Sequence, residues 1–182
     1  YPAAPVSPYG ASKLSFEHYL HVYREVHGLS SVAMRFANVY GPRQDPHGEA
    51  GVGAIFSRAL LAGQPAAING DGGQTRDYVY VADVAAAMMS ALQSQRTGAY
   101  NVGTEIETDV NQLYELIAAA AGVRTPAEHD PARPGEQRRS CVATSRIRRD
   151  FGWAPRVSLA EGIPPTVDFF RQVNPPRQAA AP

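Results

Sequence analysis

Tyr9 and Lys13 are the two side chains in this chain whose types and spacing best suit acid–base chemistry. They stand four residues apart, so both project from one face if the segment is helical. A phenol ordinarily has a pKa near 10, and a neighbouring ammonium and the positive end of a helix both favour the phenolate. Lys13 is the only lysine among 17 basic residues. The pair indicates a tyrosine base supported by a lysine, and an ordinary pair on a solvated helix face is the alternative.

The segment that carries this pair has the signals of a helix with defined ends. Ser7 can cap the free backbone N–H groups, and Pro8 suits the first helical position because that position needs no N–H donor. Gly28 is a typical helix terminator. Between these ends, apolar side chains recur at helical spacing, namely Phe16, Leu20, Tyr23 and Val26. The sequence therefore predicts one long helix that presents the tyrosine and the lysine in its first turns.

Segments typical of strands and of helices alternate along the rest of the chain, which favours an α/β fold. We expect strands at 31–36, 65–69, 78–81 and 99–102, and helices at 54–62, 83–95, 109–121 and 145–151. Asp83 and Asp109 are the expected caps of two of these helices. Residues 38–53 and 123–140 are expected to be loops. Because proline lacks an N–H donor, the last helix is expected to begin at Pro164 and Pro165 and to end near Arg171.

The composition argues against several classes of protein. The 17 basic and 17 acidic residues give a formal net charge of +0, which disfavours a nucleic-acid partner or an anionic membrane. No apolar stretch approaches the length of a membrane span. Cys141 is the only cysteine, so an intramolecular disulfide is impossible and a cytoplasmic location fits best. His18 with His21, and His47 with Glu49, offer at most two ligands each, so no metal site is expected.

Six short motifs occur in one order along the chain, and together they resemble the latter half of the extended short-chain dehydrogenase/reductases, in particular the nucleotide-sugar epimerases and dehydratases. The motifs are Tyr9-Gly-Ala-Ser-Lys13, Arg35-Phe-Ala-Asn-Val-Tyr-Gly-Pro-Arg43, Arg76-Asp-Tyr-Val-Tyr-Val81, Tyr100-Asn-Val-Gly103, Arg133-Pro-Gly-Glu136 and Phe151-Gly-Trp153. The resemblance runs from about Ser7 to Arg171. Within the group, residues 44–52 look most like the UDP-glucose 4-epimerase branch.

The resemblance implies the C-terminal part of a Rossmann-type, doubly wound parallel sheet and a small α/β substrate-binding domain. Residues 1–41 and 76–104 would belong to the NAD-binding domain, residues 42–75 and 105–172 to the substrate-binding domain, and residues 173–182 to a tail. None of the 16 glycines stands in a G-x-G-x-x-G pattern, so we expect an upstream segment to supply most contacts with NAD. The 182-residue chain alone is expected to be inactive and to bind no detectable NAD.

The resemblance also assigns roles to the residues around the nicotinamide. In such enzymes a tyrosine phenolate takes the proton of a sugar hydroxyl while hydride leaves the same carbon for NAD. The hydride then returns to the other face of the turned intermediate. By position, Tyr9 would be the base, Lys13 would hold the nicotinamide ribose and support the phenolate, and Phe36 and Ala37 would lie beside the nicotinamide.

The substrate of such an enzyme is a nucleotide-diphosphate sugar, whose phosphates need hydrogen-bond donors. By position, Asn38, Arg76 and Arg133 match the phosphate and nucleotide contacts of the group. Simpler explanations exist for each of them. Arg76 could form a local ion pair with Asp77, Arg133 could be a surface arginine, and Asn38 could shape a turn.

Three further residues match positions near the ribose and the base. Glu136 is a candidate contact for a ribose hydroxyl, and Val52 and Asn69 are candidate backbone or edge contacts near the base. Where some relatives place an aromatic ring that stacks on uracil, this chain has Asn69. The sequence therefore leaves the identity of the base open.

The function that the resemblance implies is NAD-dependent epimerisation of a nucleotide sugar, with UDP-glucose and UDP-galactose exchanged at C4. One alternative is a 4,6-dehydratase or a reductase with the same tyrosine and lysine. The other is a nucleotide-sugar-binding fragment that has no turnover of its own. A homodimer through the helix that carries the tyrosine is also implied by resemblance.

Overall fold

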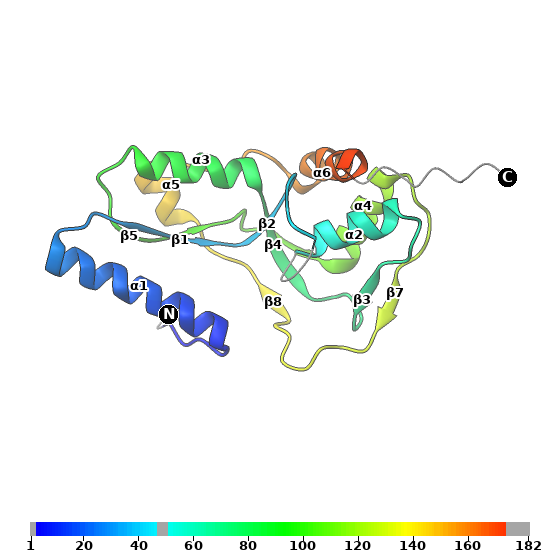
Figure 1. The fold of residues 1–182 in the computed structure, drawn as a ribbon, viewed down its shortest axis with the longest axis horizontal. Helices are drawn as coiled ribbons and strands as arrows, with labels where there is room; N and C mark the ends of the chain where they lie inside the picture. Colours follow the sequence, from blue (N-terminus) through cyan, green and yellow to red (C-terminus); the bar gives the residue numbers. More distant parts are fainter. Residues whose placement is uncertain (1–2, 47–50, 174–182) are drawn as a thin grey trace.

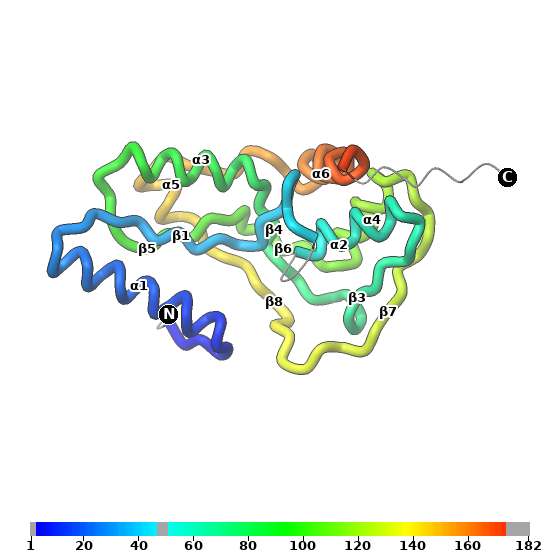
Figure 2. Tube along the Cα trace, viewed as in Figure 1, coloured from blue at the N-terminus to red at the C-terminus, as the bar shows by residue number. Residues whose placement is uncertain are grey.

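The computed structural model describes residues 3–46 and 51–173, which form two halves joined by a mixed sheet (Figures 1 and 2). The expectations for residues 47–50 and for the tail from 174 to 182 lie outside the described residues. Helix and strand segments alternate along the chain as the sequence predicts.

The first half is built on two parallel strands, β1 (Val32–Phe36) and β5 (Gly98–Val102). Helices α3 (Val81–Leu92) and α5 (Ser145–Phe151) lie over one side of this pair, and α1 (Pro8–His27) lies on the other side (Figure 1). The buried side chains of this half are Val79, Val84, Ala87, Tyr100, Val102, Ile147 and Trp153. Segments that are far apart in sequence, including 145–153, thus share one apolar core.

The joining sheet is centred on β4 (Thr75–Tyr80). This strand pairs in parallel with β2 (Asn38–Tyr40) and with β8 (Arg139–Ser140), and antiparallel with β6 (Glu107–Asp109). The alternation of strand side chains places Arg76 and Tyr78 on one face of β4 and Asp77 on the other. β4 is therefore the element that directs several of the predicted site residues.

The second half packs three helices together, α2 (Val52–Leu61), α4 (Val110–Ala121) and α6 (Leu159–Val173). A short parallel pair, β3 (Ala67–Asn69) with β7 (Glu128–Asp130), completes it (Figure 1). Its core includes Phe56, Leu60, Ile68, Leu113, Ile117, Ile163 and Val167. Burial of these side chains supplies the main stabilising free energy of this half.

The predicted ends of several helices are confirmed. The Ser7 Oγ atom accepts a hydrogen bond of 3.0 Å from the Gly10 amide, and α1 ends at Gly28, whose φ of 67° suits glycine. Asp109 caps α4 in the same way, with 2.8 Å between its carboxylate and the Gln112 amide. These interactions span three residues, so local sequence suffices to predict them.

The prediction for the last helix is wrong, because α6 begins at Leu159 and contains Pro164 and Pro165 in its interior. Ser158 and Glu161 form a capping box at its start. The Ser158 amide donates to the Glu161 carboxylate at 2.9 Å, and the Glu161 amide donates to the Ser158 hydroxyl at 3.3 Å. Ile163 lies in the helical turn before the prolines, which was expected to lie outside the helix, and its side chain is buried. Capping and burial outweigh the backbone hydrogen bonds that the prolines lose.

Other local expectations also need correction. Asp83 does not cap α3. That helix is preceded by Tyr80, and the Asp83 carboxylate accepts backbone N–H groups of Arg156 and Val157, both at 3.0 Å. The expected loops 38–53 and 123–140 contain β2, the start of α2, and the short strands β7 and β8. These short strands exist because distant strands pair with them, which local composition does not reveal.

The predicted domain limits remain a prediction, although the packing groups residues 145–153 with the β1–β5 half. Within residues 3–46 and 51–173, no helix combines the length and the apolar character that a bilayer span requires.

Candidate functional site

The predicted catalytic pair lies together on the first turns of α1. The Lys13 Nζ atom is 5.0 Å from the centroid of the Tyr9 ring. The Tyr9 residue is 60% exposed, and α1 contains no buried residue. The helix is tied to β1 by the Arg35 guanidinium, which donates to both Glu17 oxygens at 2.6 and 2.5 Å. This hydrogen bonding lowers the pKa of Glu17. The geometry places the ammonium over the phenol ring, as a cation–π contact.

Five of the predicted substrate residues line a single small cavity of about 70 Å³ beside β4. They come from different elements: the start of β2, the start of α2, the end of β3, the start of β4 and the segment before β8. The five residues are Asn38, Val52, Asn69, Arg76 and Glu136. Since up to 98 residues of sequence separate them (136 − 38), only the tertiary fold brings them together.

Arg76 is the cation of this cavity. Its Nη1 atom donates to the carbonyls of Gln137 at 2.7 Å and Thr75 at 2.8 Å, and its Nη2 atom lies 3.2 Å from the Glu136 carboxylate. A local ion pair with Asp77 does not form, so that alternative is wrong. Asp77 points the other way and accepts hydrogen bonds from the backbone and hydroxyl of Thr104 at 2.8 and 2.7 Å. The guanidinium is therefore held toward the cavity.

Tyr78 is a cavity residue that the sequence analysis missed. Its hydroxyl oxygen is buried and, among the described residues, has no hydrogen-bond partner. Burial raises the pKa of Tyr78 to about 12, so the phenol is neutral and can donate. A buried polar group without a partner commonly marks a place where a ligand or water completes the bonding. The signal was present, because residues two apart on a strand share a face and Arg76 precedes Tyr78 by two.

Gln74 is the second side chain that the sequence analysis missed. It is buried, and its Nε2 atom donates to the Asn69 carbonyl at 3.1 Å. This hydrogen bond fixes the end of β3, where Asn69 faces the cavity. No local pattern distinguishes such a glutamine from a surface residue.

Arg133 is the predicted phosphate contact that the structure does not bring to the cavity lining. It is exposed, at the start of a turn in which its carbonyl accepts the Glu136 amide at 3.2 Å. Gly135 adopts a φ of 77° in this turn, a conformation that favours glycine. Arg133 and Glu136 therefore share one turn, but only Glu136 lines the cavity.

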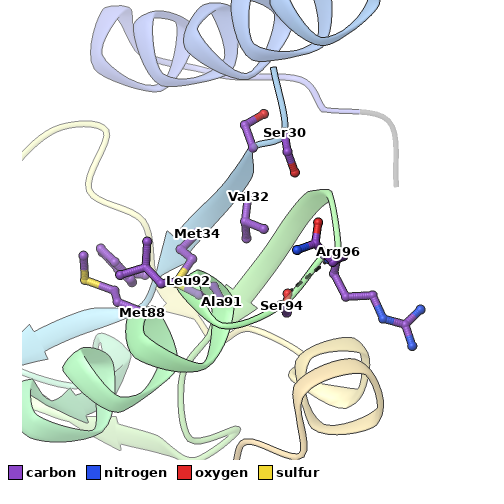
Figure 3. A pocket seen from close by; sticks show the side chains of 11 residues that line it. Ser30, Val32, Met34, Met88, Ala91, Leu92, Ser94 and Arg96 are labelled. Atoms are coloured by element: carbon purple, nitrogen blue, oxygen red, sulfur yellow. Dashed lines mark hydrogen bonds between the residues drawn. The ribbon is translucent and has the colours of Figure 1, made fainter. Parts of the chain in front are cut away.

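The residues predicted to lie beside the nicotinamide are at the end of β1. Phe36 is 45% exposed and lines a separate pocket between β1 and α3. Met34, Met88 and Leu92 line the same pocket (Figure 3). Ala37 donates its amide to the Val102 carbonyl at 2.9 Å, which continues the pairing of β1 with β5. Phe36 and Ala37 thus connect the β1–β5 strands directly to Asn38 at the cavity. Within the described part of the chain, no group of three or more potential ligand side chains could hold a metal ion.

Comparisons with known proteins agree with this geometry. A family model described as GDP-mannose 4,6 dehydratase matches residues 1–166. The UDP-glucose 4-epimerase of Mycolicibacterium smegmatis is 51% identical over 171 residues, which are 93% of this chain and 55% of that protein. The chain thus spans about half the length of this relative.

Two solved structures have the same fold as this chain. The UDP-glucose 4-epimerase of Thermotoga maritima with UDP-glucose has a TM-score of 0.90 and 44% identity, covering 93% of this chain and 55% of that one. The Thermus thermophilus UDP-glucose 4-epimerase in complex with NAD has a TM-score of 0.86 and 48% identity, covering 92% and 55%. The expected fold, the C-terminal part of a Rossmann-type epimerase, is confirmed. The chain belongs to the family of NAD-dependent nucleotide-sugar epimerases and dehydratases.

Proposed function

We propose that this chain carries the acid–base pair and the substrate site of a nucleotide-sugar 4-epimerase that exchanges UDP-glucose and UDP-galactose. The observation that carries the proposal is the convergence of Asn38, Arg76, Tyr78 and Glu136 on one cavity. A guanidinium, an amide and a neutral phenol are donors suited to a diphosphate. The sequence identity to UDP-glucose 4-epimerases supports the same substrate class.

The proposed chemistry assigns distinct tasks to the two ends of the site. Tyr9 accepts the proton of the C4 hydroxyl and later returns it, and the Lys13 ammonium beside the ring supports the phenolate. Arg76, Tyr78 and Asn38 hold the diphosphate, so the sugar is free to turn about its link to the phosphates. Val52 and Asn69 would recognise the base. Arg133, which precedes Glu136 in the same turn, would make a further contact with the phosphates.

NAD is the cofactor of this proposal, and when bound it takes up and returns the hydride of the sugar carbon. The residues of this chain fit a share of that group: Lys13 has three N–H donors for ribose hydroxyls and stands beside Tyr9. Phe36 and Ala37, at the end of β1, would contact the nicotinamide side. The remaining contacts with NAD would come from outside this chain.

A 4,6-dehydratase is the second candidate, because the matching family model is described as GDP-mannose 4,6 dehydratase. Both reactions begin with the same proton transfer to Tyr9, so this chain's residues serve either one.

A cytoplasmic location is also part of the proposal. So is a homodimer through α1, which exposes the apolar side chains Phe16, Tyr19, Tyr23 and Val26.

The test joins this chain to the part of the Mycolicibacterium smegmatis relative that it does not match and follows the conversion of UDP-galactose to UDP-glucose. Replacing Tyr9 with Phe should lower kcat by about 10²- to 10⁴-fold, because the general base is lost. The affinity for UDP should stay within about twofold, because Tyr9 lies outside the diphosphate cavity.

The matched control is Tyr19→Phe, which makes the same change at an exposed position of the same helix. Its rate should equal that of the unmodified protein. Normal turnover by Tyr9→Phe would contradict the mechanism. Formation of a 4-keto-6-deoxy sugar from a nucleotide sugar would favour the dehydratase instead.

A further inference from the structure

Lys13 has two available partners on its own helix, because residues four apart in an α-helix lie side by side. Tyr9 stands four residues before it and Glu17 four residues after it. The Lys13 ammonium lies over the Tyr9 ring, 5.0 Å from the ring centroid. Among the described residues, Glu17 forms its ion pair with Arg35 of β1 and not with Lys13. The second of the two partners is thus bound by another cation.

The Arg35 guanidinium holds both oxygens of the Glu17 carboxylate. Its Nε atom donates to one oxygen at 2.6 Å, and its Nη2 atom donates to the other at 2.5 Å. Two parallel bonds from a planar guanidinium fix the direction of a carboxylate more firmly than one ammonium does. The Glu17 side chain is 21% exposed and lines a cavity of about 140 Å³ together with residues of β1 and β5. The carboxylate is therefore held on the side of α1 that faces the strands (Figure 1).

We propose that Arg35 is a positioning residue of the acid–base site, which acts by withholding the Glu17 carboxylate from Lys13. This inference rests on the proposed function, because it takes Tyr9 and Lys13 to be the acid–base pair. With Arg35 in place, the lysine keeps Tyr9 as its partner, so its positive charge stays beside the phenol that must lose a proton. The ion pair thus does more than fasten α1 to β1.

The physical reason is that the two contacts open to Lys13 are close in strength. A lysine and a glutamate four apart on an exposed helix attract each other weakly, and so do a lysine and an exposed aromatic ring. Without Arg35, the Glu17 carboxylate would therefore hold the ammonium for about half of the time. It would then neutralise the charge that favours the phenolate of Tyr9.

A purely structural role of the ion pair makes a different prediction. Arg35 and Glu17 would then matter only because they fasten α1, which contains no buried residue, to β1. Loss of either partner would have the same consequence for Lys13. Withholding of the carboxylate requires the two losses to differ, because Glu17 competes for the lysine only when it is charged and released from Arg35.

NMR on this chain distinguishes the two roles, because Lys13 is its only lysine and a ¹³C label at the lysine ε carbon gives one signal. The signal is recorded at about pH 8, where lysine and glutamate are charged and histidine is neutral. In the unmodified chain the ring current of Tyr9 should displace this signal from the position of a free lysine. Tyr9→Leu should abolish the displacement, which identifies its source.

The single and double variants should then differ in a defined way. In Arg35→Met the displacement should fall by about half, because the released Glu17 shares the ammonium. In Glu17→Gln it should stay as in the unmodified chain. In the double variant, Arg35→Met with Glu17→Gln, it should return to that value, because the competing charge is gone.

The matched control is Arg24→Met, which breaks the ion pair of 2.9 Å with Glu25 on the same helix. Glu25 stands twelve residues after Lys13 (25 − 13), too far along the helix to reach it. The lysine signal of this variant should equal that of the unmodified chain. In the protein joined to the Mycolicibacterium smegmatis segment, kcat should fall about twofold in Arg35→Met and recover in the double variant.

The outcomes separate this inference from the proposed function. Equal lysine signals in Arg35→Met and Glu17→Gln would overturn the inference, and so would a displacement that is absent from the unmodified chain. A signal that moves in Glu17→Gln alone would contradict it as well, even if Arg35→Met did not fold. If the lysine signals behave as expected but Tyr9→Phe turns over normally, the withholding of Glu17 stands and the proposed function fails.

Discussion

The helix that carries Tyr9 and Lys13 and the cavity beside β4 hold complementary parts of the proposed site, but they are built in opposite ways. The helix α1 has no buried residue, and both residues of the proposed acid–base pair stand on this one element. The cavity draws its walls from several elements and includes a buried tyrosine hydroxyl and a paired arginine. Within this chain, the substrate end of the proposed site is supported by core packing, whereas the acid–base end is supported by polar contacts such as Arg35 with Glu17.

The difference follows from where each region finds its packing partners. The cavity lies against the core that contains Phe56, Leu113 and Ile163, and Phe56 itself lines it. The apolar side of α1, which includes Phe16 and Tyr23, remains exposed. A functional group is positioned well only when its supporting element is fixed by packing. We therefore expect nucleotide binding to be a property of this chain and turnover to require further structure.

The largest effect in this comparison should be on stability. Leu113 in α4 is 0% exposed and Phe16 in α1 is 61% exposed. Leu113→Ala should lower the free energy of unfolding by about 2–5 kcal/mol, because it removes buried methyl groups and leaves a cavity. Phe16→Ala should change it by less than about 0.5 kcal/mol. Urea unfolding of both variants measures this, and equal losses would contradict the claim that α1 is unpacked.

A smaller effect is expected on the affinity for UDP, which should distinguish the cavity beside β4 from α1. Arg76→Ala should weaken UDP binding by about 1.5–3 kcal/mol, because a charge-assisted hydrogen bond is lost. Lys13→Ala also removes one positive charge but lies on α1, and it should leave the affinity for UDP within about twofold. Calorimetry of the two variants compares them directly. A loss of UDP affinity in Lys13→Ala equal to that in Arg76→Ala would show that the two regions form one binding site in this chain.

The smallest effect concerns the ion pair between Arg139 and Glu107, which joins β8 to β6. The hydrogen bonds from Arg139, and then from Thr75, hold the pKa of Glu107 at about 2. A lowered pKa in the folded state stabilises the fold above the ordinary glutamate value, and this contribution is lost as pH falls toward 2. In Arg139→Gln the pKa of Glu107 should rise toward about 4.3, the ordinary value. NMR titration of the Glu107 carboxylate measures this pKa, and an unchanged value would show that Arg139 does not stabilise the charged carboxylate.

Signals within a few residues predicted much of the fold. The caps at Ser7 and Asp109 and the end of α1 at Gly28 agree with the structure. The same local logic failed at α6, where the prolines were given more weight than the Ser158–Glu161 capping box. It failed again at Asp83, whose carboxylate bonds to residues more than 70 positions away. Local rules hold where the partner is local, and they fail where a distant segment competes for the same group.

The sequence by itself determined the α/β class, the family, and the residue types of the proposed site, because these depend on ordered motifs and on short-range spacing. Only the tertiary structure decided which of those residues meet. Arg76 pairs with Glu136, 60 residues away, and not with its neighbour Asp77. Tyr78 lines the cavity, and Arg133 does not. The physical reason is that strand pairing and core packing set the direction of each side chain, and these interactions connect segments that no local pattern relates.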